Sequence, residues 1–98
     1  MLTYYVIYRD DAKARPAGIF IMDPATESAI LWNHRKAVWS YDPSLVLRFL
    51  DDYRNLDRYE NVDRSVVEGV VQEVTGGEGL PDEDSIALML EKGLRQAQ

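Results

Sequence analysis

The residues best suited to chemistry are few, and they begin with a single histidine. His34 is the only histidine in the 98-residue chain, and there is no cysteine. A serine nucleophile would need that histidine as its base, but Ser44, Ser65 and Ser85 stand where helices are expected to begin, and serine is a common helix cap. Neither a Gly-x-Ser-x-Gly nor a His-Glu-x-x-His motif is present. We therefore expect no catalytic residue and no enzyme.

Three acidic clusters, at residues 10–11, 51–52 and 82–84, could offer oxygen ligands to a divalent cation. None continues into the loop that closes an EF-hand, with its glycine and final glutamate. A glycine-rich stretch at residues 76–79 precedes three carboxylates and lacks the Gly-Lys-Ser/Thr of a phosphate-binding loop. The sequence therefore predicts no metal site and no cofactor.

Acidic residues dominate the second part of the chain. The formal net charge is -6, and all of the excess acid lies in residues 41–98. Such a field repels phosphate backbones and attracts basic partners, and it also keeps a small protein soluble. If the charge serves recognition, the contact residues on the acidic helical region are expected to be Asp51, Asp52, Asp57 and Glu60.

Basic and aromatic residues gather at the end of the first part of the chain. This segment contains Trp32, His34, Arg35, Lys36, Trp39 and Tyr41. Tryptophan, tyrosine and arginine are the preferred anchors of protein interfaces, and the same residue types line grooves for single-stranded nucleic acid. The tryptophans could equally fill the core. The net charge disfavours nucleic acid as the partner.

The elements that must position these residues change type near residue 40. Residues 2–9, 18–22 and 28–33 are apolar runs rich in β-formers, which predict three strands. Polar or turn-forming segments join them, so we expect an antiparallel meander, with a short fourth strand at residues 37–39 as an alternative. In all three runs both faces are largely apolar, which is typical of strands buried on both sides.

The remainder predicts three helices. Asp42 and Pro43 form a start signal, followed by an apolar stripe that runs from Leu45 to Tyr53. A second stripe of valines spans residues 66–74, and a third helix begins in the acids at 82–84. We expect one α+β domain over residues 1–98, in the order βββααα, with a β-meander at 1–40 and a helical half at 41–98.

A sheet that is apolar on both faces needs two covers, and three short helices are few for both. Either one helix crosses to the second face, or another chain buries that face. We therefore predict a small non-catalytic protein-binding module. It would associate with itself as a homodimer, or bind and inhibit another, basic protein as immunity proteins do. The alternative is a nucleic-acid or nucleotide-binding accessory domain that uses the Trp32–Trp39 segment. No apolar run is long enough to cross a membrane, and a cytoplasmic location is expected.

Overall fold

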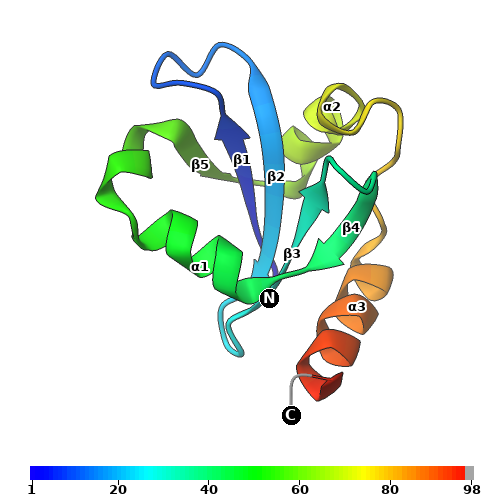
Figure 1. Cartoon of the computed structure of the whole chain (residues 1–98). Coiled ribbons are helices and arrows are strands. Elements are labelled where there is room, and N and C mark those ends of the chain that lie inside the picture. The colour runs from blue at the N-terminus through cyan, green and yellow to red at the C-terminus, as the bar shows by residue number, and fades with distance from the viewer. Residues whose placement is uncertain (97–98) are drawn as a thin grey trace.

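The computed structural model describes residues 1–96, which form a five-stranded antiparallel sheet flanked by helices (Figure 1). The strand order across the sheet is β4-β3-β2-β1-β5. The strands are β1 (Thr3–Tyr8), β2 (Pro16–Asp23), β3 (Ser28–Asn33), β4 (Val38–Tyr41) and β5 (Tyr59–Val62). The helices are α1 (Pro43–Asp51), the 3-10 helix η1 (Tyr53–Arg58), α2 (Arg64–Thr75) and α3 (Glu83–Gln96).

The predicted α+β class and antiparallel meander are confirmed, and the alternative fourth strand is present as β4, at Val38–Tyr41 instead of 37–39. The turn between β2 and β3 begins as expected at Asp23, whose carbonyl accepts the Thr26 N–H over 3.3 Å. The Asp23 side chain accepts the Ala25 N–H over 3.0 Å. This double use of one aspartate is typical of a tight turn, and it fixes the Asp23 carboxylate at the end of β2.

The fifth strand corrects the predicted order βββααα. β5 follows α1 and η1 in the chain and pairs with the free edge of β1, with Val62 opposite Tyr4 and Tyr59 opposite Ile7. Its four residues are too few for a periodic signal. Residues 41–98 are therefore not purely helical, and the sheet draws strands from both halves of the chain.

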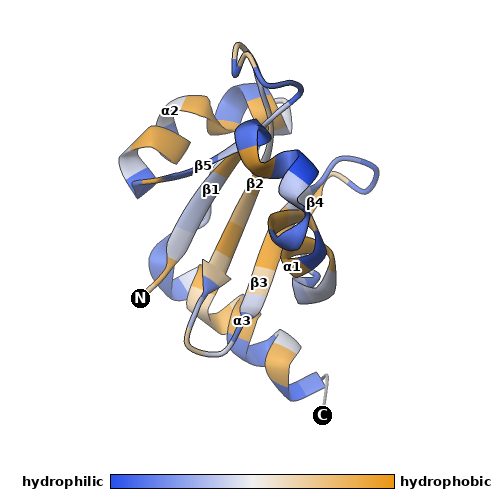
Figure 2. Cartoon of the chain, turned by 90° about the vertical axis from the view of Figure 1, so that its left-hand side faces the viewer, coloured by the Kyte–Doolittle hydropathy of each residue, from blue (hydrophilic) through white to orange (hydrophobic). Residues whose placement is uncertain are grey.

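The two sheet faces have separate covers. On the first face, Val6, Ile19, Ile21 and Ile30 are fully buried beneath α2 and α3. On the second face, Met22, Ala29 and Leu31 are buried beneath α1. Figure 1 shows α1 on one side of the sheet and the other two helices on the opposite side, and Figure 2 shows apolar residues concentrated in β2 and β3.

Of the two expected ways to cover the second face, the structure shows the crossing helix, and the expectation of an open face is wrong. α1 crosses to the second face, where its Val46 side chain is fully buried against β3. The open-face homodimer loses its physical basis, because the apolar surface that would drive it is covered within one chain.

The helix ends largely follow their local signals. Asp42 caps α1 by accepting the Leu45 N–H over 3.1 Å, and Pro43 occupies the first turn. Gly76 closes α2 with a left-handed backbone, φ 73°. The stripe predicted to continue to Tyr53 stops early, because α1 ends at Asp51. Tyr53 therefore lies outside the core, with 84% of its surface exposed.

Within residues 1–96, no helix is long and apolar enough to span a lipid bilayer.

Candidate functional site

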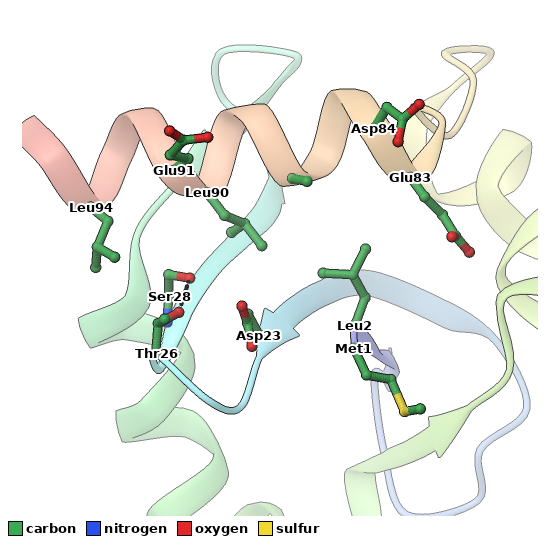
Figure 3. Close-up of a pocket in the computed structure, with 11 residues that line it drawn as sticks. Met1, Leu2, Asp23, Thr26, Ser28, Glu83, Asp84, Leu90, Glu91 and Leu94 are labelled. Atoms are coloured by element: carbon green, nitrogen blue, oxygen red, sulfur yellow. Dashed lines mark hydrogen bonds between the residues drawn. The ribbon is translucent and has the colours of Figure 1, made fainter.

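A groove of about 440 Å³ runs between α3 and the strand ends beneath it (Figure 3). One wall is α3, and the other is formed by the start of the chain and by the turn between β2 and β3. We call this site the acidic groove. Its lining comprises Met1, Leu2, Asp23, Thr26, Ser28, Glu83, Asp84, Ala87, Leu90, Glu91 and Leu94.

The floor of the acidic groove is apolar. Leu90 and Leu94 project from α3 toward the strands, and Leu2 projects from below toward the helix (Figure 3). Leu90 and Leu94 are four residues apart, so they lie on one side of the helix. Leu90 also belongs to the core, where it is only 4% exposed. The floor is thus a continuation of the first-face core that reaches the surface.

Four acidic side chains also line the acidic groove. The Asp23 carboxylate lies between the two walls, and Glu83 extends from α3 toward the strands, whereas Asp84 lies on the outer side of the helix (Figure 3). Glu91 forms an ion pair with Arg95 over 3.2 Å. Among the described residues, no lysine or arginine pairs with Asp23, Glu83 or Asp84. The acidic groove therefore carries uncompensated negative charge beside an apolar surface.

The helix start that supplies Glu83 is fixed by Asp82. Its carboxylate accepts the Ser85 N–H over 2.7 Å. Hydrogen bonds from Ser85 lower the pKa of the Asp82 carboxyl below its ordinary value, and the positive charge of Arg64 adds to this effect. Both favour the ionised form. The predicted role of the acids at 82–84 as a helix start is thus confirmed for Asp82.

This cap makes part of the stability depend on pH. A carboxyl whose pKa is lower in the folded state stabilises the fold at neutral pH, and that contribution is lost as the pH falls through the folded-state pKa. We expect the melting temperature of the wild type to fall more steeply on acidification than that of Asp82→Asn, since asparagine still caps but does not ionise. Thermal melts from neutral to strongly acidic pH test this. Parallel curves would contradict it.

Of the aromatic residues in the predicted contact segment, Trp32 is buried and Trp39 and Tyr41 are half-buried. Trp32 is 4% exposed and belongs to the first-face core. Trp39 packs edge-on against it, with ring centroids 5.3 Å apart, and its Nε1 donates to the Gly79 carbonyl over 3.4 Å. Tyr41 packs against α3 at Gly93. The core interpretation of Trp32 is therefore confirmed, and this residue offers no surface to a partner or a base.

The basic residues of the same segment are exposed in the turn between β3 and β4. Arg35 and Lys36 are exposed whereas Trp32 is buried, so these two cations share no exposed surface with Trp32. His34 turns toward β2, where its Nε2 lies 2.8 Å from the Ala17 carbonyl oxygen.

The predicted acidic contact residues are spread over three kinds of element. Asp51 ends α1, Asp57 lies in η1 and Glu60 lies in β5, so these acids do not all lie on helices as expected. Two of the four form ion pairs within the protein. Asp52 binds Arg54 with contacts of 2.8–3.2 Å, which lowers the pKa of its carboxyl. Glu60 pairs with Lys13 over 3.5 Å.

A small apolar patch on η1 was not predicted. Tyr53 and Leu56 are 84% and 63% exposed. Their spacing of three residues places them on the same side of a 3-10 helix. The apolar stripe in the sequence predicts Tyr53 in the core. Tyr53 is exposed because α1 ends before it, at Asp51.

The acidic groove was also missed. The sequence shows the acids at 82–84 and the turn at Asp23, but it does not show that α3 lies across that turn. Within residues 1–96, no three histidine or acidic side chains are placed to hold a metal ion together.

No protein-family model, curated protein or solved structure matches this chain.

Proposed function

We propose that this protein is a non-catalytic binding module that holds a basic amphipathic segment of another protein in the acidic groove. The single observation that carries the proposal is the juxtaposition of an apolar floor, Leu90 and Leu94, with the unpaired carboxylates of Asp23 and Glu83. Such a surface complements a segment whose leucine-like side chains alternate with lysine or arginine at helical spacing.

The length of the groove supports a peptide segment rather than a small amine. Its α3 wall extends from Glu83 to Leu94, which at the rise of an α-helix spans roughly 16 Å. A single amine would occupy only one end of this surface. A short helix could place apolar side chains on the leucines and a cation near each carboxylate. Blocking a basic enzyme, as inhibitor proteins do, is one use of such a module.

The overall charge supports the same type of partner. The net charge of -6 would accelerate encounter with a basic protein. The nucleic-acid alternative has less support, because Trp32 of its aromatic segment is buried and a phosphate backbone would be repelled from the acidic groove.

The groove can be tested with a pair of neighbouring substitutions on α3. Ala87 is exposed and lines the groove, whereas Leu88 is 63% exposed and lies outside it. We expect Ala87→Arg to weaken binding of a fluorescent helical peptide of leucine and lysine about tenfold, or about 1.4 kcal/mol, because the new guanidinium occupies the groove. Leu88→Arg adds the same charge to the next residue and should leave the affinity nearly unchanged.

A second pair of measurements separates charge from shape. Asp23→Asn with Glu83→Gln keeps the side-chain sizes and removes two charges, so the peptide affinity should fall and its salt dependence should weaken. The same peptide with glutamate in place of lysine should not bind. The proposal is overturned if Leu88→Arg weakens binding as much as Ala87→Arg, or if only Tyr53→Ser with Leu56→Ser abolishes it, which would move the contact to η1.

A further inference from the structure

A second cavity, of about 490 Å³, lies at the opposite end of the sheet from the acidic groove. The loop between β1 and β2, the turn between β3 and β4, and the last turn of α2 meet around it. We call it the basic pocket. Its lining is Arg9, Arg15, Pro16, Ala17, His34, Glu73 and Val74. Cavities of this size commonly hold small molecules.

Arg9, Arg15 and His34 bring nitrogen-bearing side chains to the lining of the basic pocket. Among the described residues, neither Arg9 nor Arg15 forms an ion pair. The His34 ring is held by the contact of its Nε2 with the Ala17 carbonyl oxygen at 2.8 Å. Because a carbonyl oxygen only accepts, Nε2 is the donor and Nδ1 is the ring's remaining polar atom. The two unpaired guanidinium groups are well suited to an oxyanion.

The wall of the basic pocket that α2 forms is negatively charged. Glu73 contributes a carboxylate, and it belongs to the last turn of α2, where the helix dipole is negative. Both features oppose a simple anion and favour a donor such as an ammonium or hydroxyl group. The pocket therefore presents cationic groups on one wall and an anionic group on the other.

We propose that the basic pocket binds a small phosphomonoester that also carries an amino or hydroxyl group. The phosphate contacts Arg9 and Arg15, and the donor group faces Glu73. A dianionic phosphate suits two guanidinium groups better than a carboxylate does, since each guanidinium forms paired hydrogen bonds to its oxygens. This site is separate from the acidic groove, and the proposal does not depend on the proposed function.

Phosphoethanolamine, inorganic phosphate and ethanolamine are suitable probes. We expect phosphoethanolamine to bind about tenfold more tightly than either of the others, as measured by titration calorimetry. The backbone amide of Ala17 and the ring of His34 should shift in NMR spectra. Arg9→Ala with Arg15→Ala should abolish binding of both phosphate compounds while leaving the melting temperature nearly unchanged, because both side chains are exposed.

Glu73→Gln gives the most specific signature. The substitution should lower the affinity for phosphoethanolamine, because its ammonium group loses its partner. It should raise the affinity for inorganic phosphate, which no longer faces a negative charge. The matched control is Arg35→Ala with Lys36→Ala, which removes two exposed cations of the nearby turn that lie outside the pocket. This control should bind phosphoethanolamine as the wild type does.

Three results would overturn the proposal. Equal losses in the control and in the Arg9 and Arg15 variant would show that diffuse positive charge attracts the anion. Equal affinities of the wild type for phosphoethanolamine and inorganic phosphate would remove the role of Glu73. Tighter binding of a phosphoserine peptide that has no free amine would show that the ligand is a phosphorylated protein and not a small molecule.

Discussion

Replacing Gly93 with alanine is expected to destabilise the protein by about 2 kcal/mol, as overpacking does. The ring of Tyr41 lies against the backbone of α3 at this position. An added Cβ would stand 2.6 Å from the Tyr41 Cδ2 atom and would also overlap Cγ and Cδ1. Because Cγ is next to the backbone of β4, the ring cannot escape by a small rotation. Denaturant unfolding monitored by circular dichroism gives the change in free energy.

Gly69→Ala is the matched control, and we expect it to stabilise the protein. Gly69 is also inside a helix, but no atom lies within 4 Å of the Cβ position. Alanine therefore brings only its better helix propensity, about 1 kcal/mol at most. If both substitutions stabilise the protein, α3 does not pack against β4 as described.

A double substitution isolates the contact. Tyr41→Ala removes the ring that obstructs the new methyl group, so Gly93→Ala should become neutral or stabilising in that background. The coupling free energy of this cycle should be about 2 kcal/mol. A coupling near zero would place the cost of Gly93→Ala elsewhere in α3.

The parts of the fold that could be predicted are those encoded by neighbours in the sequence. Asp42 and Pro43 mark the start of α1 because capping involves residues within one turn. β3 could be placed from its own apolar residues, and the turn at Asp23 from its own turn chemistry. The length of α1 could not be predicted, because Tyr53 continues the apolar spacing but begins a 3-10 helix, Tyr53–Arg58, that is capped by Asp52.

The parts that could not be predicted depend on contacts between distant residues. β5 exists because Tyr59 and Val62 meet β1 more than fifty positions earlier in the chain. Four residues with two apolar side chains have little strand preference alone, and the free edge of β1 supplies the hydrogen bonds. The acidic groove and the basic pocket have the same origin, because each joins a turn between strands to a helix from the second half of the chain.

The crossing of α1 to the second face explains how three short helices cover a sheet that is apolar on both sides. α2 and α3 share the first face, while α1 places Val46, Leu47 and Leu50 over the second. Phe49 extends this cover, with its ring 5.4 Å from Phe20 and 6.0 Å from Tyr59. The second face therefore depends on a helix of only nine residues.

Val46→Asp should consequently have the largest effect of any substitution in α1. Val46 is fully buried, and an unpaired carboxylate at that position would cost about 4 kcal/mol. We expect α1 to detach and to expose Met22 and Leu31. The variant should then bind a hydrophobic dye and sediment as a dimer or larger species, because the uncovered face is an apolar surface of the kind that drives association.

Ser44→Asp is the control, since it adds the same charge to the same helix at an exposed position. An acid in the first turn is favourable or neutral, so this variant should keep the sedimentation coefficient and the stability of the wild type. A stable, non-associating Val46→Asp protein would show that α1 does not seal the second face. In that case the homodimer through the sheet would again become the simplest way to bury it.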